Sequence, residues 1–141
     1  MKINSISYNK NAVGIILSLV RIFVGFAMLT HGYPKLQKLL SGEEIQFVSL
    51  FGFNEKFTLI LAVLAEFVSS IFIILGLFTR SFCLPLILTM IIAGFVIHSP
   101  DVFADRELAF LYLAIYALIF VLGGGNLSID ALMSRRKDIN Y

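Results

Sequence analysis

The chain has 141 residues, of which 59% are hydrophobic and only 14% are charged, and its mean hydropathy is +0.93. Soluble domains are about 45–50% apolar and about 25% charged, so this composition indicates a membrane protein with no separate soluble domain. The formal net charge of +2 comes without a clustered basic face, which excludes a nucleic-acid-binding protein. We therefore expect a single membrane domain over residues 1–141.

Four apolar runs are each long enough to cross a hydrocarbon core about 30 Å thick, some of them with tilt. They cover residues 13–30, 57–78, 82–98 and 108–125. Lipid offers no hydrogen-bond partners to backbone groups, and the runs lack two-residue alternation, so we predict helices. The fold class that follows is all-α, an integral membrane four-helix bundle with antiparallel up-and-down connections.

Two shorter helices are predicted outside these runs. Ser41-Gly42-Glu43-Glu44 has the pattern of a capping box and is followed by apolar residues, which predicts a short amphipathic helix at the interface, about residues 41–52. Ser128-Ile129-Asp130 predicts the start of a second short helix, which ends in Arg135-Arg136-Lys137.

The distribution of Lys and Arg predicts the orientation of the chain. With four spans, both termini and the 79–81 turn share one side of the membrane, which holds six Lys and Arg against four on the other side. The positive-inside rule then places both termini in the cytoplasm. The six are Lys2, Lys10, Arg80, Arg135, Arg136 and Lys137, and the four are Lys35, Lys38, Lys56 and Arg106.

Arg21 and Glu66 are the charged residues inside the first two runs, each nine residues from the predicted outer end. That distance is about 14 Å along a helix, near the middle of the core. A lone charge there costs at least about 2.5–3.5 kcal/mol, so such residues pair or line a cavity. We predict that the two lie face to face, either as a structural ion pair or as the floor of a polar pocket.

A second polar cluster is predicted at the outer rim of the bundle. His31 and Lys35 follow the first run, His98 ends the third, and Glu107 precedes the fourth, in which Tyr112 extends the cluster inward. Ordinary interfacial residues, a metal or haem site, and a pocket for the polar head of a lipid or quinone-like ligand are the alternatives.

The cofactor is not specified by the sequence. Cys83 is the single cysteine, which excludes an intramolecular disulfide, a C-x-x-C redox pair and a cysteine-ligated iron–sulfur cluster within the chain. The residues around the two histidines show no haem or metal motif. A quinone stays as a candidate ligand.

These segments, in their order and spacing, resemble the DoxX family of small four-helix bacterial membrane proteins. The resemblance covers about residues 13–133. The matching pieces are Leu19-Val20-Arg21-Ile22, His31-Gly32-x-x-Lys35-Leu36, Ala65-Glu66, Gly76-Leu77-x-Thr79-Arg80, Thr89-Met90-x-x-Ala93, His98, Glu107 and Gly123-Gly124-Gly125-Asn126-Leu127-Ser128-Ile129-Asp130.

The resemblance implies a bacterial-type inner-membrane protein that takes part in quinone-linked redox work. We therefore expect a subunit of a quinone-linked oxidoreductase, in which Arg21, Glu66, His31 and His98 hold a quinone head group. Arg21 would bind a carbonyl oxygen, and Glu66 or a histidine would exchange protons. Because the sequence has no self-contained catalytic motif, electrons would come from a redox partner protein or a soluble donor, and enzyme status stays open.

Two other functions are consistent with the sequence. The first is a non-enzymatic membrane scaffold or interaction subunit, in which Arg21 and Glu66 only lock the bundle. The second is a carrier of small solutes or lipids, which four spans without discontinuous helices or paired repeats disfavour. Membrane lipids are the expected surroundings, and the oligomeric state stays open.

Overall fold

The structure is a computed structural model that describes residues 9–42, 44–99 and 102–139. All regular secondary structure in these ranges is helical, so the all-α prediction is confirmed. The elements are α1 (Lys10–Leu40), α2 (Glu55–Val63), the π-helical segment η1 (Leu64–Val68), α3 (Ser69–Leu75), α4 (Thr79–Ile92), the π-helical segment η2 (Ala93–Ile97), α5 (Phe103–Leu122) and α6 (Ile129–Ile139).

Three continuous helical stretches are long and apolar enough to cross a membrane. They are Lys10–Leu40, Glu55–Leu75 and Thr79–Ile97. Large apolar side chains cover their outer faces, among them Phe23, which is 75% exposed. Such surfaces suit contact with lipid. α5 has 20 residues but begins with charged side chains, so a fourth span stays a prediction.

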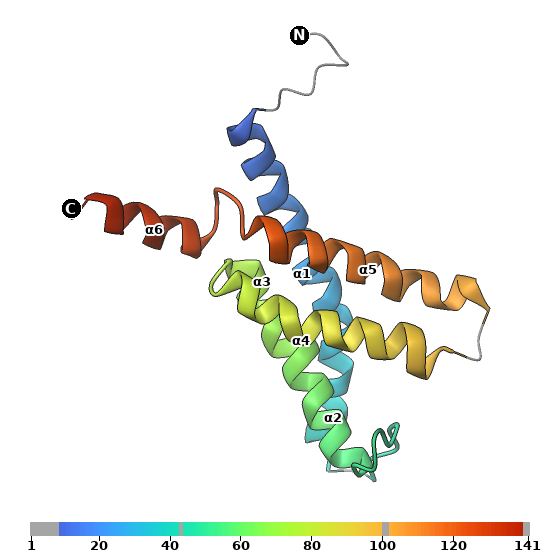
Figure 1. The fold of residues 1–141 in the computed structure, drawn as a ribbon. Helices are drawn as coiled ribbons and strands as arrows, with labels where there is room; N and C mark the ends of the chain where they lie inside the picture. The colour runs from blue at the N-terminus through green and yellow to red at the C-terminus, as the bar shows by residue number, and fades with distance from the viewer. Residues whose placement is uncertain (1–8, 43, 100–101, 140–141) are drawn as a thin grey trace.

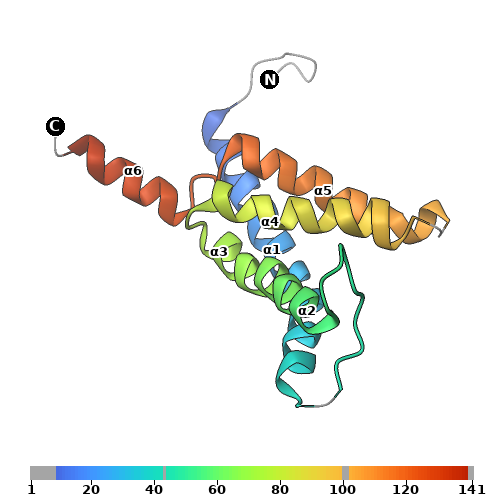
Figure 2. The same ribbon diagram turned by 60° about the horizontal axis from the view of Figure 1, so that its bottom comes forward.

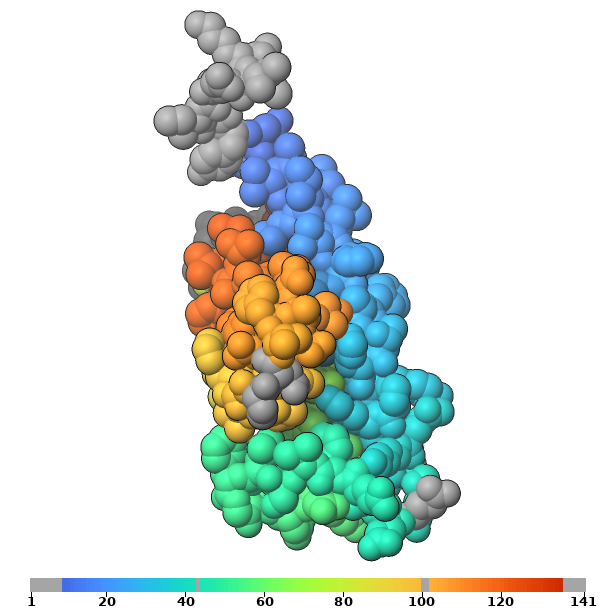
Figure 3. All heavy atoms as spheres, turned by 90° about the vertical axis from the view of Figure 1, so that its right-hand side faces the viewer, coloured from blue at the N-terminus to red at the C-terminus, as the bar shows by residue number. Residues whose placement is uncertain are grey.

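The helices form two side-by-side pairs that cross (Figures 1 and 2). α1 packs beside the continuous α2–η1–α3 helix, and α4–η2 packs beside α5. Figure 3 shows α1, in blue to cyan, along the height of one face and next to α5, in orange. α6 extends away from both pairs (Figures 1 and 2). The up-and-down four-helix bundle stays a prediction.

The first helix is longer than the run predicted over residues 13–30. α1 has 31 residues and continues through Pro34 to Leu40. At 1.5 Å per residue it is about 46 Å long, well beyond a core about 30 Å thick. His31 and Lys35 therefore lie within the helix rather than beyond its end.

The amphipathic helix predicted over residues 41–52 is wrong, because the described part of this segment is non-helical. Gly42 and Gly52 have φ of +72° and +81°, in the left-handed region, which interrupts a right-handed helix. A side chain binds this non-helical backbone instead: the Phe47 N–H donates to Glu55 Oε2 at 3.1 Å.

The turn between the second and third runs also lies earlier than predicted. The second run, expected over residues 57–78, ends at Leu75, and Gly76 follows with φ of +67°. α4 begins at Thr79, so the turn comprises residues 76–78 rather than 79–81.

The remaining boundaries are close to the predicted ones. The third helical stretch ends at Ile97, one residue before the predicted end of 82–98. The fourth run, predicted over 108–125, is the helix Phe103–Leu122. The short helix after it is confirmed, and Ser128 Oγ accepts the Ala131 N–H at 3.1 Å at its start.

Small residues of α1 face the other helices. Gly14, Ser18, Gly25 and Gly32 are all buried, which allows neighbouring backbones to approach closely. A Cβ atom on Gly32 would lie 2.7 Å from the backbone nitrogen of Phe67 in η1. α1 and η1 therefore touch through their backbones at this point.

We expect Gly32→Ala to destabilise the protein, because the backbone of Phe67 cannot turn away from the added methyl group. Overpacking of this kind costs about 1–3 kcal/mol. Thermal unfolding in detergent measures the loss. Gly94→Ala is the matched control, because its methyl would lie 2.9 Å from the edge of the Phe110 ring, a side chain that can turn. Equal losses in the two variants contradict the prediction.

Candidate functional site

Arg21 is fully buried in α1, and its guanidinium binds four backbone carbonyls. Nε donates to Gly124 O at 2.9 Å and Nη2 to Leu127 O at 3.2 Å. Nη1 donates to the carbonyls of Ile73 and Ile74. The last carbonyls of a helix have no partner within it and carry its negative dipole end, so the cation caps α3.

The predicted contact between Arg21 and Glu66 is wrong, because Glu66 forms its ion pair with Lys35. Lys35 follows Arg21 by 14 residues on the same helix, about 21 Å along its axis. The prediction ended the first helix near residue 30 and so placed Arg21 too close to the level of Glu66. Since α1 reaches Leu40, the level of Glu66 is that of Gly32 and Lys35.

Asp130 of α6 lies near Arg21 and caps the first turn of α4. Its carboxylate accepts the N–H groups of Phe78 and Thr79 at 2.8 and 2.9 Å and the Thr79 hydroxyl at 2.7 Å. Burial alone would raise the pKa of Asp130, but the hydrogen bonds from Thr79 and Phe78, with the charge of Arg21, hold this pKa below its usual value. We call Arg21, Thr79, Gly124, Leu127 and Asp130 the Arg21 cluster.

The Arg21 cluster joins α1, α3, α4, the loop after α5 and α6. The same loop is tied to α1 a second time, because the Leu127 N–H donates to Ser18 Oγ at 3.0 Å and the Asn126 N–H donates to Gly14 O at 3.1 Å. These bonds are all internal to the protein. The cluster therefore holds the fold together, and backbone carbonyls take four of the five N–H groups of the Arg21 guanidinium.

A cavity of about 200 Å³ lies at the other end of α1, between α1, η1, the α4–η2 helix and α5. We call it the Glu66 cavity. It is lined by Met28, His31, Lys35, Glu66, Met90, Ala93, His98, Asp105, Leu108, Ala109 and Tyr112. Its polar groups come from four segments of the chain that are distant in sequence.

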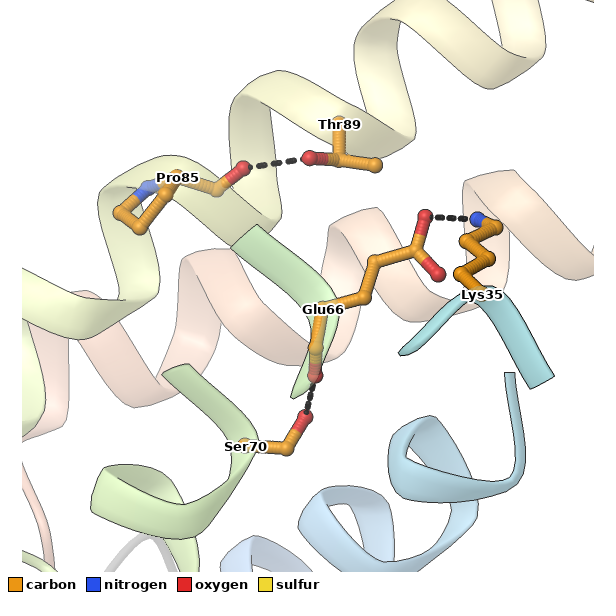
Figure 4. A network of polar contacts seen from close by, with 5 residues as sticks. All are labelled: Lys35, Glu66, Ser70, Pro85 and Thr89. Atoms are coloured by element: carbon orange, nitrogen blue, oxygen red, sulfur yellow. Dashed lines mark hydrogen bonds and ion pairs between the residues drawn. The ribbon is translucent and has the colours of Figure 1, made fainter. Parts of the chain in front are cut away.

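The ion pair of Glu66 and Lys35 lies at this cavity, and Figure 4 shows Glu66 reaching from η1 toward Lys35. The side chain of Glu66 is 4% exposed and that of Lys35 is 29% exposed. The Ser70 hydroxyl donates to the backbone carbonyl of Glu66. On α4, Thr89 Oγ1 donates to Pro85 O at 2.8 Å, within its own helix (Figure 4).

Both π-helical segments contribute to the Glu66 cavity. Glu66 belongs to η1, Ala93 begins η2, and His98 directly follows η2. A π-turn adds a residue to a helical turn and changes the direction of its side chains, and such turns are frequent at functional sites. Sequence periodicity did not reveal these segments, although a lone Glu in an apolar run marked one of them.

Tyr112 covers one wall of the cavity and is 9% exposed. Its ring makes an edge contact with His31, with centroids 5.9 Å apart, and stacks on Tyr116 at 6.0 Å. The Tyr116 hydroxyl donates to Val24 O at 3.3 Å. No other residue in the described ranges forms a hydrogen bond with the Tyr112 hydroxyl, which leaves it for a ligand.

The structure thus gathers five of the seven candidate residues around one cavity: His31, Lys35, Glu66, His98 and Tyr112. Arg21 lies in its own cluster, and Glu107 is exposed on α5 and does not line the cavity. Asp105, two residues before Glu107, lines it instead and was not predicted. Within the described ranges, no three His, Cys, Asp or Glu side chains are grouped to hold a metal ion.

A family model matches residues 16–99, more than half of the chain, and its description is DoxX. The chain belongs to the DoxX family. The match includes the Lys35–Glu66 pair and His98 but ends before α5. Family membership and the three apolar helices together make this an integral membrane protein. Neither the curated proteins nor the solved structures give a match to the chain.

Replacing Arg21 by Met is expected to destabilise the protein by about 3 kcal/mol or more, because several buried carbonyls lose a charged donor. Arg21→Lys should not restore the loss, since an ammonium group cannot reproduce the planar fork of a guanidinium. Thermal unfolding in detergent measures both. Arg80→Met is the control: Arg80 is exposed and its Nη2 donates only to Val121 O, at 3.2 Å. A fully stable Arg21→Met variant contradicts the prediction.

Asp130 should make stability depend on pH. Because its pKa is lower in the folded protein than the ordinary 3.8, its carboxylate stabilises the fold above the unfolded pKa. That stabilisation is lost as the pH falls through the folded value. The Tm difference between the wild type and Asp130→Asn should therefore shrink as the pH falls from about 6 to about 3. A difference that stays constant over this interval argues against the assignment.

Proposed function

We propose that this DoxX-family protein is an inner-membrane subunit of a quinone-linked oxidoreductase and that the Glu66 cavity binds the ring of the quinone. The observation that carries the proposal is the meeting of Glu66, Lys35, His31 and Tyr112 around one cavity of about 200 Å³ in an apolar protein. A cavity of about 150 Å³ accommodates benzene, so the volume suits one six-membered ring with small substituents.

The lining groups supply the chemistry that a quinone ring requires. The Lys35 ammonium and the Tyr112 hydroxyl are donors for a carbonyl oxygen and for the negative charge that develops on it during reduction. Glu66 and the histidines are groups that exchange protons with such an oxygen. In this proposal Lys35 takes the role that the sequence assigned to Arg21, whose guanidinium is occupied by backbone carbonyls.

The proposal includes a redox partner and an orientation. The sequence has no internal redox cofactor motif, so electrons come from a partner protein or a soluble donor. With α5 as a fourth span and both termini in the cytoplasm, the Arg21 cluster faces the cytoplasm and the Glu66 cavity opens toward the outer side. A ligand with an apolar tail then reaches the cavity from the surrounding lipid.

Quinone binding by the purified full-length chain tests the proposal, with tetramethyl-1,4-benzoquinone as the probe in isothermal titration calorimetry. Tyr112→Phe removes one donor oxygen from the cavity and should weaken binding about 2- to 10-fold. Tyr116→Phe is the matched control, because the Tyr116 hydroxyl is bonded to Val24 O and does not line the cavity. Failure of the wild type to bind both this quinone and its reduced form, or equal losses in the two variants, refutes the proposal.

A further inference from the structure

One carboxylate oxygen of Glu66 is buried and accepts no hydrogen bond from the described residues. Glu66 is 3% exposed and contacts Lys35 through Oε1, whereas Oε2 has no hydrogen-bond partner among the described residues. Buried polar atoms are nearly always hydrogen-bonded, and an unpaired one lowers stability. An unpaired carboxylate oxygen beside a cavity therefore points to a donor supplied by a ligand.

The carboxylate is able to turn toward such a ligand. The Ser70 hydroxyl donates to the backbone carbonyl of Glu66 and so restrains the backbone from which the side chain extends (Figure 4). The terminal torsion of a Glu side chain is broad and roughly two-fold. Either oxygen can therefore face the Glu66 cavity while the other keeps its contact with Lys35.

Because Glu66 Oε2 needs a hydrogen-bond donor, it distinguishes the oxidised form of a quinone ring from the reduced form. An oxidised quinone presents two carbonyl oxygens, which only accept, and an ionised carboxylate also only accepts, so the two repel. A hydroquinone presents O–H groups, and a hydrogen bond from O–H to a carboxylate is about twice as strong as one between neutral groups. Tyr112 does not discriminate between the two states, because its hydroxyl both donates and accepts.

We infer that the Glu66 cavity prefers the reduced, hydroxyl-bearing ring to the oxidised quinone, because the Glu66 carboxylate accepts a hydrogen bond from the ring hydroxyl. This inference rests on the proposed function, since it names which form of the quinone class the same cavity binds. It concerns binding alone.

Three ring ligands test the preference on the full-length chain in detergent under anaerobic conditions. They are tetramethyl-1,4-hydroquinone, the corresponding quinone, and the dimethyl ether of the hydroquinone, which has no donor. Calorimetry should give a Kd for the hydroquinone at least about tenfold lower than for the other two.

Glu66→Gln should reduce this ratio to near one, because its amide offers a donor to the quinone and a neutral acceptor to the hydroquinone. Glu107→Gln is the matched control: the same chemical change on the exposed surface of α5, away from the cavity, should leave the ratio unchanged. Tyr112→Phe should weaken both ring forms by the same factor, which provides a second variant if Glu66→Gln does not fold.

The outcomes separate the two proposals. Equal affinity of the wild type for quinone and hydroquinone overturns this inference and leaves the proposed function standing. No binding of any of the three ligands overturns both. A preference for hydroquinone that persists in folded Glu66→Gln shows that another group accepts the hydroxyl and also overturns the inference.

Discussion

The fold depends on how the guanidinium of Arg21 is satisfied. A buried cation in so apolar a chain must be compensated, and here four backbone carbonyls do this without a carboxylate in direct contact. Because the carbonyls belong to the end of α3 and to the loop after α5, Arg21 fixes the position of both against α1. Asp130 extends the same network to the start of α4.

That fixed position determines what happens at the other end of α1. With Arg21 level with the end of α3, Gly32 touches the backbone of η1 and Lys35 reaches Glu66. The two π-helical segments then turn Glu66 and His98 toward the same space between the crossing helix pairs. At one end of the molecule the buried charge of Arg21 is thus bonded within the protein, and at the other end Lys35, Glu66 and His98 lie around the Glu66 cavity.

Much of this could be predicted from the sequence, because apolar runs, a stripe of small residues and isolated charges have direct physical causes. The grouping of His31, Lys35, His98 and Tyr112 at one end followed from their places at the ends of the runs. The partners of Arg21 could not be predicted in this way, because they depend on α1 continuing past Pro34, and a proline normally indicates the end of a helix. The π-turns were also out of reach, since both lie in runs that are apolar at nearly every position, where a one-residue shift of the hydrophobic stripe cannot be seen.

The bond from Arg21 to Gly124 joins residues 103 positions apart in the chain. During synthesis, α1 is made long before the loop that supplies this carbonyl and that of Leu127. The first helix therefore enters the membrane before two of the acceptors of its charge exist, and they become available only after α5 has been made. The buried charge of the first helix thus obtains its full set of hydrogen bonds only late in assembly, from the loop between α5 and α6.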